Sequence, residues 1–370
     1  MTPEEKVLLL FSLFPSTPGT IASVQDIISG GPFDYGRLVG LAGTNGVSPL
    51  LYLNLSTLQG IPELPMNELR KAYLRTVKEN VVRGAEVMRL LTSFKKRDIE
   101  VIPLKGPIAS DIIFGNPGLY PSGDIDFLVH PSDLQRTKQV LLEEGYNASV
   151  LEEGDMLRCG YHLIFEKGRN VLEVHWKLSF RYFDIPPEFW WEDIRIMKYQ
   201  DTEVLMLSPE RYLLYAIFRL YSHAFRPLRF LIFVAALLRS YRQELDWVSL
   251  SIFSEKFRMA RLVSFTLKLL REFQELNVPE TMVKRRLFGY RGLKRLVFSG
   301  LFHEVGKIHP RMLLFTALQQ TPLDTIKILS ERIFPSLSEI RLRYHLPAGS
   351  KKVYGYYLLN PLLMIMRKRG

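Results

Sequence analysis

The sequence predicts an α+β fold in three parts: an N-terminal helical region over residues 1–96, a core of strands and helices over 97–200, and a helical, basic C-terminal domain over 201–370. Apolar residues recur at the helical period of about 3.6 residues in the first and last parts. In the middle part, short apolar runs alternate with helix-like segments. The 370 residues are 47% hydrophobic and 24% charged, so the chain can bury a sizeable core, and a disordered protein is excluded.

The N-terminal region is predicted to be helical because apolar side chains repeat on one face. One such face is formed by residues that follow one another at steps of four: Leu69, Tyr73, Val77 and Val81. Glycine and proline gather where we expect the helices to be joined, at 15–19, 30–32 and 60–65.

The core is predicted to combine strands with two helices. Four apolar runs have the length of strands: Glu100–Leu104, Ile125–Val129, His162–Phe165 and Val171–Trp176. Gly168 predicts a hairpin turn between the last two. The helices are expected at Pro107–Phe114 and at Ser132–Glu144, where Pro131 and Ser132 form the cap and Gly145 ends the helix.

The C-terminal domain is predicted to be a helical bundle. Ser208-Pro209-Glu210 has the features of a helix start, with serine at the N-cap, proline in the first turn and an acidic residue after it. Helices with apolar faces are expected at about 210–224, 227–242, 246–274 and 323–333.

The charge is distributed unevenly along the chain. The net charge is +11, yet residues 1–200 hold 21 Lys and Arg against 25 Asp and Glu, and residues 201–370 hold 28 against 13. A basic half can attract nucleic acid, nucleotide phosphates or anionic lipid. The alternative is a solvated helical surface rich in arginine, because the only dense basic runs are Lys284–Arg286 and Arg367–Arg369.

Several classes of protein are excluded by what the sequence lacks. The longest apolar runs, Leu8–Phe14 and Phe230–Leu238, fall short of the ~18–20 residues of a membrane span. The first residues show no basic-then-apolar secretory pattern. The single cysteine, Cys159, rules out an internal disulfide and a metal site built from cysteines. We therefore expect a cytoplasmic protein with no transmembrane segment.

The segment Gly123–Val129 carries two carboxylates at alternate positions. In a strand, Asp124 and Asp126 point to one face. Two carboxylates about 6–7 Å apart on that face can share divalent cations, and paired metals recur in displacement at phosphorus. The alternative is a pair of solvated aspartates beside a turn, since so short a pattern arises by chance. We expect both carboxylates to be exposed at the floor of a cleft.

The segment Leu104-Lys-Gly-Pro107 ends a strand and opens a helix. Pro107 suits the first helical position. Gly106 lets the backbone approach a ligand closely, and free amides at a helix start bind phosphate. Lys105 adds a cation beside them, so the amides near Gly106 are expected to face the two aspartates. The alternative is an ordinary strand-to-helix turn.

The strand Leu172–Trp176 places Glu173 and His175 on one face. A carboxylate from a neighbouring strand would complete a metal site with the aspartates or accept a proton as a general base. The alternative is that Glu173 is an exposed strand residue and that His175 or His162 is a hydrogen-bonded structural histidine.

Taken in order, these segments resemble the nucleotidyltransferase superfamily of the DNA polymerase β kind. More narrowly, the chain resembles the bacterial family of largely uncharacterised nucleotidyltransferases called family 5. Its members read leucine-lysine-glycine, then arginine-proline-x-x-Asp-x-Asp-x-leucine-valine, then Glu-x-His-Trp; the matching segments here are Leu104–Gly106, Tyr120–Val129 and Glu173–Trp176. The likeness covers about residues 35–280, and Tyr120 stands where the family usually has arginine.

The resemblance implies a nucleotidyltransferase-type mixed sheet and transfer of a nucleotidyl group from an NTP to an acceptor, dependent on Mg²⁺ or Mn²⁺. It implies that Asp124, Asp126 and Glu173 are the catalytic and metal-binding residues, with Glu173 about 4–7 Å from the aspartates. It places Lys105 and Gly106 near the triphosphate. The acceptor stays open among protein, RNA and small molecules, as does the oligomeric state.

A second class of function is a catalytically inactive relative that binds RNA, a protein or a membrane surface through its basic C-terminal half. Tyr120 favours this hypothesis if the family arginine contacts a phosphate, and the three acidic residues favour the enzyme. The stretch Lys284–Arg295 could bind nucleic acid through its cations, Phe288 and Tyr290, or pack its aromatic rings inward. The apolar segment Tyr354–Met366 could contact a membrane peripherally or dock on the protein, and Pro361 is expected to break any helix there.

Overall fold

The computed structural model describes most of the chain. The described residues are 1–148, 161–179, 183–274, 276–284, 287, 289–303, 311–344, 346–347 and 349–366. Some residues considered above lie outside these ranges: Cys159, Arg285, Arg286, Phe288 and Arg367–Arg369.

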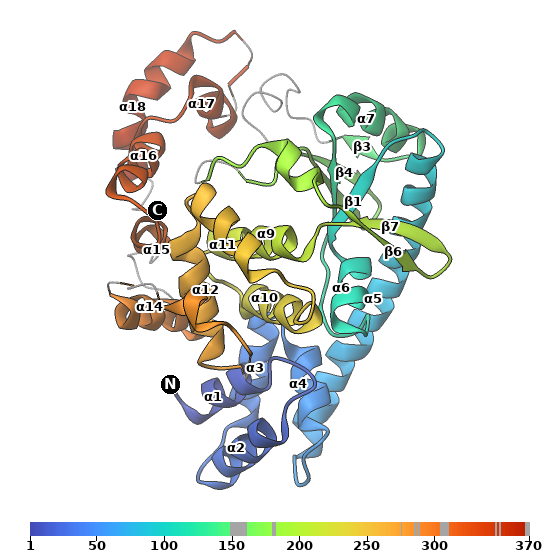
Figure 1. Ribbon diagram of the computed structural model, residues 1–370, viewed down its shortest axis with the longest axis vertical. Coiled ribbons are helices and arrows are strands. Elements are labelled where there is room, and N and C mark those ends of the chain that lie inside the picture. Colours follow the sequence, from blue (N-terminus) through green and yellow to red (C-terminus); the bar gives the residue numbers. More distant parts are fainter. Residues whose placement is uncertain are drawn as a thin grey trace.

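The N-terminal region is helical, as predicted. Its helices are α1 (Pro3–Leu10), α2 (Pro18–Ser29), α3 (Tyr35–Asn45), α4 (Ser48–Leu55) and α5 (Glu63–Lys95). Helix α5, with 33 residues, packs against α4 and continues along one side of the molecule to the sheet (Figure 1). It thereby joins the N-terminal helices to the core.

A five-stranded mixed sheet forms the core and confirms the predicted α+β class. Its strands are β1 (Val101–Lys105), β2 (Ile125–Val129), β3 (Asn147–Ala148), β4 (His162–Lys167) and β5 (Asn170–His175), in the order β1-β2-β5-β4-β3. Strands β2 and β5 are parallel, and the other neighbours are antiparallel. The predicted hairpin turn joins β4 to β5 at Gly168, whose φ of 58° favours glycine.

Local sequence signals predicted the helices of the core well. Helix α6 (Pro107–Phe114) has the predicted bounds. The helix expected at Ser132–Glu144 begins instead as a 3₁₀ turn, η1 (Pro131–Asp133), and continues as α7 (Leu134–Glu143). Gly145 follows it with φ 81°, in agreement with a glycine stop.

A second, two-stranded sheet was not anticipated. After the 3₁₀ turn η2 (Pro187–Trp191), strands β6 (Arg195–Tyr199) and β7 (Thr202–Met206) form an antiparallel hairpin. The boundary predicted between 200 and 201 falls in its turn, and the three-domain division stays a prediction. Arg195, Lys198 and Glu203 interrupt the apolar residues of the hairpin and shorten the apolar runs on which strand prediction depends.

The C-terminal part is helical. Its helices are α9 (Pro209–Ser222), α10 (Leu228–Ser240), α11 (Trp247–Lys256), α12 (Ala260–Arg271), α13 (Glu280–Val283), α14 (Tyr290–Phe302), α15 (Arg311–Ala317), α16 (Pro322–Ile333), α17 (Leu337–Arg343) and α18 (Lys352–Met366). Among the described residues, none of the helices combines the length and the apolar character that crossing a membrane requires.

Two predictions in this part were wrong. The helix expected over 246–274 is two helices, because the chain leaves the helical conformation at Arg258, whose φ is 57°. Pro361 does not break the last helix, since α18 continues through it. The preceding residue, Asn360, accepts hydrogen bonds from Arg343 and Tyr344 and is fully buried, and this packing against α17 holds the helix together around the proline.

Helices α9 and α10 lie at the centre of the molecule, between the sheet and the remaining C-terminal helices (Figure 1). Most of their side chains are buried. Tyr212 on α9 donates a hydrogen bond from its hydroxyl to the carbonyl of Leu104, 2.5 Å away at the end of β1. Helix α9 is therefore fixed against the edge of the sheet where the predicted site residues lie.

Candidate functional site

Three neighbouring strands bring the predicted site residues into one row. In the sheet register, Lys105 of β1 pairs with Asp126 of β2, and Asp126 pairs with Glu173 of β5. Paired residues on adjacent strands share a face of the sheet. The register of β1 shifts between Pro103 and Lys105, which aligns the last residue of the strand with Asp126.

Lys105 joins the two aspartates. Its Nζ lies 2.9 Å from Oδ2 of Asp124 and 3.0 Å from Oδ2 of Asp126. Burial alone would lower the pKa of Lys105, but the charges of Asp126 and Asp124 outweigh it and hold the pKa above its ordinary value. Lys105 is therefore a cation placed between two carboxylates, and the sequence had predicted it only as a phosphate contact.

The aspartates differ in exposure, and the expectation that both are exposed was wrong for Asp126. The Asp126 side chain is 0% exposed, whereas that of Asp124 is 32% exposed. Asp126 lies inside β2, which has a strand on either side, while Asp124 precedes the strand. Oδ2 of Asp126 also has no hydrogen-bond partner among the described residues, although the Lys105 ammonium is near. The cleft expected over the pair stays a prediction.

Glu173 completes a group that we call the carboxylate cluster: Asp124, Asp126 and Glu173. One oxygen of each lies within 4.8 Å of the others, so the proximity expected for Glu173 is found. Burial raises the pKa of Glu173, but the hydrogen bond and charge of His175, together with the charge of Lys105, lower it to about 2. Glu173 is therefore ionised at neutral pH.

His175 connects two members of the cluster. Its Nε2 lies 3.1 Å from Oδ1 of Asp126 and 3.2 Å from Oε2 of Glu173, and its side chain is 3% exposed. A ring nitrogen between two carboxylates carries a hydrogen. His175 thus follows the alternative of a hydrogen-bonded structural histidine, and it orients both carboxylates.

Gly106 lies directly beside Asp124. Its φ of 95° is one that side chains rarely adopt, and an added Cβ would stand 3.4 Å from the carbonyl oxygen of Asp124 and 3.5 Å from Oγ of Ser122. Gly106 also immediately precedes α6, whose first helical residue is the predicted Pro107. The backbone at the helix start therefore approaches the backbone of Asp124 closely.

Helix α9 contributes residues that the sequence analysis missed. Tyr212, Tyr215 and Arg219 recur on one face of α9, and Tyr212 fixes that face to the end of β1. The Tyr215 hydroxyl is buried and has no hydrogen-bond partner in the described part of the chain. Burial lowers the pKa of Arg219, but Tyr215, Asp126 and the other acidic neighbours raise it above its ordinary value. The spacing of Tyr212, Tyr215 and Arg219 along one helical face was the available signal.

Tyr120 is a buried core residue, whereas the arginine usual at this position in the family would carry a charge. Its ring is 5% exposed and packs against Phe114 and Phe233, with ring centroids 5.5 and 5.2 Å away. Burial is the main cause that raises the pKa of Tyr120 to about 12. Its carbonyl accepts a hydrogen bond from Asn80 of α5. The side chain at this position is therefore part of the packing between α6 and α10.

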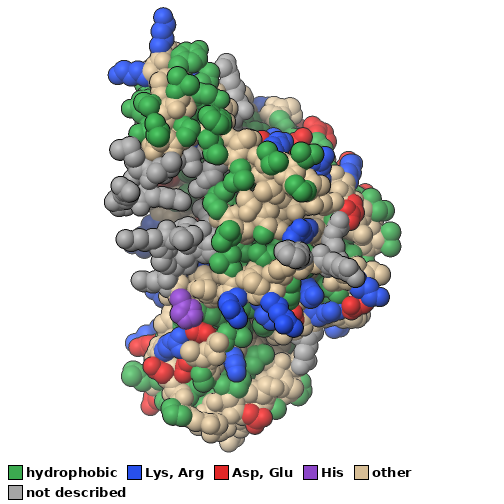
Figure 2. Space-filling view, turned by 90° about the vertical axis from the view of Figure 1, so that its left-hand side faces the viewer, with side chains coloured by type: hydrophobic (Ala, Val, Ile, Leu, Met, Phe, Trp, Pro, Cys, Tyr) green, Lys and Arg blue, Asp and Glu red, His purple; other side chains and the backbone are tan. Residues whose placement is uncertain are grey.

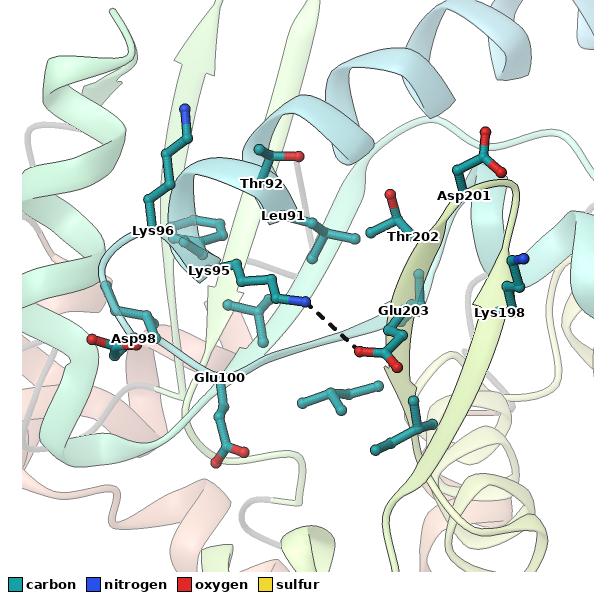
Figure 3. Close-up of a pocket in the computed structure, with 16 residues that line it drawn as sticks. Leu91, Thr92, Lys95, Lys96, Asp98, Glu100, Lys198, Asp201, Thr202 and Glu203 are labelled. Atoms are coloured by element: carbon teal, nitrogen blue, oxygen red, sulfur yellow. Dashed lines mark ion pairs between the residues drawn. The ribbon is translucent and has the colours of Figure 1, made fainter.

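A separate groove lies at the other end of β1 (Figure 3). It has a volume of about 1230 Å³ and is lined by the end of α5, the start of β1 and the β6–β7 hairpin. Lys95 and Glu203 form an ion pair across it, 3.7 Å long. The described residues that line it include no member of the carboxylate cluster.

The donors of the carboxylate cluster fit a hard divalent cation such as Mg²⁺. Such cations take carboxylate oxygens as ligands, and the cluster supplies oxygens from three residues within 4.8 Å. The position between Asp124 and Asp126 already attracts a cation, the ammonium of Lys105. Oδ2 of Asp126, buried within the described structure without a hydrogen bond, has a lone pair available for a ligand.

Comparison with known proteins shows the family of the chain. A family model described as uncharacterised nucleotidyltransferase matches residues 31–275, about two thirds of the chain. The chain belongs to this family. No curated protein and no solved structure matches it.

Proposed function

We propose that this family member transfers a nucleotidyl group from an NTP to an acceptor, using Mg²⁺ or Mn²⁺ held by Asp124, Asp126 and Glu173. The observation that supports the proposal is the carboxylate cluster itself. Asp126 and Glu173 come from two parallel strands and Asp124 from the residue before the first of them, with one oxygen of each within 4.8 Å of the others, in a chain of a nucleotidyltransferase family. Acidic residues in such an arrangement serve displacement at phosphorus in other proteins.

A divalent cation bound there would supply positive charge that polarises the phosphate and stabilises the charge developing on its oxygens. The protein's own residues prepare the site. Asp124 and Asp126 provide oxygens on one side, Glu173 provides one from the next strand, and His175 keeps Asp126 and Glu173 oriented. The geometry is held by the sheet before any ligand arrives, which reduces the cost of binding.

We assign Glu173 to cation binding rather than to general-base catalysis. A general base works best when its pKa is near the operating pH. His175 and Lys105 lower the pKa of Glu173 against the effect of burial, so Glu173 is anionic at neutral pH, as a cation ligand must be. The acceptor hydroxyl would then lose its proton to solvent or to the acceptor's own groups.

Lys105 and Arg219 supply the positive charge for the phosphates in this proposal. Both side chains lie near the carboxylate cluster, and the pKa of each is raised, so each is charged at neutral pH. The Lys105 ammonium lies between the two aspartates, and with a divalent cation held there it would be available to contact phosphate oxygens instead. Because the side chain of Tyr120 is a buried ring, we assign to Arg219 the phosphate contact that an arginine at position 120 would otherwise make.

The test is NTP binding measured as thermal stabilisation, with and without Mg²⁺, for each of the four NTPs. We expect one or more NTPs to raise the melting temperature only when Mg²⁺ is present. Asp124→Asn should abolish this shift, while Glu203→Gln in the separate groove should retain it. If the NTP with Mg²⁺ stabilises the Asp124→Asn variant as strongly as the wild type, the carboxylate cluster is not the site.

Turnover is tested by incubation with α-labelled NTP, Mg²⁺ and cell extract. Label that enters protein, RNA or small molecules in a wild-type reaction, and not in an Asp124→Asn reaction, identifies the class of acceptor. Binding of NTP without any transfer of label would instead support the inactive relative.

That second candidate, a binding module, is favoured by one observation at the C-terminal end. Apolar side chains are exposed on α16 and α18: Leu323, Ile326, Leu329, Ile333, Tyr354, Leu358, Leu359 and Leu362. Figure 2 shows hydrophobic side chains gathered at this end of the molecule. Exposed apolar surface of this extent is typical of a contact with a partner or a membrane surface.

Nucleic-acid binding by the basic stretch is less well supported. The ring of Tyr290 packs against Phe265, with centroids 5.6 Å apart, and its hydroxyl donates to Glu272. Lys294 also pairs with Glu272. The described part of the stretch thus follows the alternative in which it packs inward. If affinity for RNA does not fall as the salt concentration rises, phosphate contacts are excluded.

The membrane contact is tested separately, by lipid co-sedimentation of the protein with and without residues 354–370.

A further inference from the structure

A second group of possible metal ligands adjoins the carboxylate cluster. It consists of His162, Glu173 and His175, each of which offers one ligand atom within 4.8 Å of the other two. Glu173 belongs to both groups. The two histidines lie in different strands of the predicted hairpin, and His162 was not part of the predicted site.

The sheet register produces this arrangement. His162 of β4 is directly opposite His175 of the antiparallel strand β5, so their side chains share a face. Glu173 is two residues before His175 and therefore lies on that face as well. The ring centroids of the two histidines are 5.1 Å apart. Two imidazoles and a carboxylate are thus held together by backbone pairing and not by a mobile loop.

One atom of this group is buried without a partner. Nδ1 of His162 is inaccessible to solvent and makes no hydrogen bond within the ranges that the structure describes. An unpaired polar atom in a buried position costs free energy, and native proteins rarely keep one without a reason. Burial is the main cause that lowers the pKa of His162 to about 4, with the charge of His175 adding to it. The imidazole is therefore neutral at pH 7, which is the form that binds metals.

The ligand chemistry differs from that of the carboxylate cluster. Three carboxylates suit Mg²⁺ and Mn²⁺, whereas imidazole nitrogen suits Zn²⁺ and related transition metals. Two histidines and one glutamate are a known ligand set for zinc. Because a carboxylate has two oxygens, Glu173 can bind one cation on each side.

We propose that His162, His175 and Glu173 form a second cation site, selective for a transition metal of the Zn²⁺ type, which shares Glu173 with the Mg²⁺ site of the carboxylate cluster. When the cation binds, the hydrogen on Nε2 of His175 moves to Nδ1 of the same ring, and the Nε2 lone pair faces the cation. The proposal concerns metal binding and does not require that the protein transfers a nucleotidyl group.

The test uses Co²⁺ as the probe, because its visible absorption reports nitrogen ligands and coordination number. Wild-type protein is titrated with Co²⁺ in the presence of excess Mg²⁺, which occupies the oxygen site. We expect one Co²⁺ per chain with visible absorption, displaced by Zn²⁺. In His162→Phe, which keeps an aromatic ring but removes the ligand, the affinity should fall by at least about 10²-fold, since removing even an indirect partner of a metal costs about 10–100-fold.

The matched control is His303→Phe, the same substitution at an exposed histidine on the end of α14, which should bind Co²⁺ as the wild type does. If His162→Phe does not fold, Asp124→Asn provides an independent check. It should keep the Co²⁺ absorption while it loses Mg²⁺-dependent NTP binding, so the failure of one proposal is distinguishable from the failure of the other. A wild type that binds no Co²⁺ in excess Mg²⁺, or a His162→Phe variant with unchanged affinity, would overturn the second site.

Discussion

The carboxylate cluster and the groove of Figure 3 lie near opposite ends of strand β1, and both are lined by acidic and basic residues. They differ in burial. In the groove, the paired side chains of Lys95 and Glu203 are 74% and 66% exposed, so water already solvates both charges. In the cluster, Asp126 is completely buried and Lys105 is only 15% exposed.

This difference supports our proposal that the carboxylate cluster, rather than the groove, binds a ligand. The groove is large, but its charges neutralise one another in water and such exposed pairs contribute little. The cluster concentrates charge in a poorly solvated place, and Oδ2 of Asp126 is buried there with the Lys105 ammonium nearby but no hydrogen bond within the described residues. An arrangement of that kind destabilises the empty protein and is found where a ligand supplies the missing interactions. The predictions below test this contrast, from the largest expected effect to the smallest.

The largest effect is expected from Asp124→Asn. Loss of one charged cation ligand should reduce nucleotidyl transfer by about 10³-fold or more, because the cation contributes several kcal/mol of charge stabilisation. The measurement is the initial rate of label transfer at saturating Mg²⁺. Glu203→Gln, which removes a carboxylate from the groove, is the control and should leave the rate unchanged. If the two variants lost transfer rate equally, the carboxylate cluster would matter no more for transfer than the groove does.

Glu173→Gln should have the next largest effect, reducing transfer by about 10²-fold. The assignment of Glu173 as a cation ligand adds a second expectation: the variant should bind NTP with Mg²⁺ about ten times more weakly. Titration of NTP against each protein at fixed Mg²⁺ measures this. Unchanged binding combined with the loss of rate would instead identify Glu173 as the general base.

His162→Phe should alter how stability depends on pH. The pKa of His162 is lowered to about 4 in the folded protein, and an unfolded chain protonates at about 6.5. Between these values the unfolded state binds more protons, so the stability contribution of neutral His162 is present above about pH 6.5 and is lost as the pH falls towards 4. Denaturant titrations at pH 7, 5.5 and 4.5 should show a weaker pH dependence in His162→Phe than in the wild type. His303→Phe serves as the control.

The smallest effect is expected from Lys95→Ala in the groove. An exposed ion pair contributes less than about 1 kcal/mol to folding, so the free energy of unfolding should change by no more than that. NTP binding and transfer should be those of the wild type. A large loss of NTP binding in this variant would show that the groove, and not the carboxylate cluster, accepts the nucleotide.

Local sequence patterns were enough to predict several elements of the fold. The alternation of Ile125–Val129 and the proline at the start of Pro107–Phe114 predicted β2 and α6 with their observed bounds. Gly168 predicted the turn between β4 and β5. These features depend on residues close in the chain, and a short segment carries them entirely. The sequence analysis missed the helix break at Arg258, because the residue with positive φ there is an arginine and not the glycine that usually marks such a helix end.

The features of the candidate site also divide into those that the sequence predicted and those that only the tertiary structure revealed. By itself, the sequence determined that Asp124 and Asp126 alternate along one strand and that Glu173 and His175 alternate along another, since the period of a strand decides which side chains share a face. Only the tertiary structure decided that β2 and β5 are parallel neighbours, that Asp126 is buried, and that His162 lies opposite His175. Pairing and burial depend on contacts between distant segments, and helix α9 must also pack against the strand ends. Outside a hairpin such as β4–β5, no local pattern specifies which of the possible neighbours a strand will pair with.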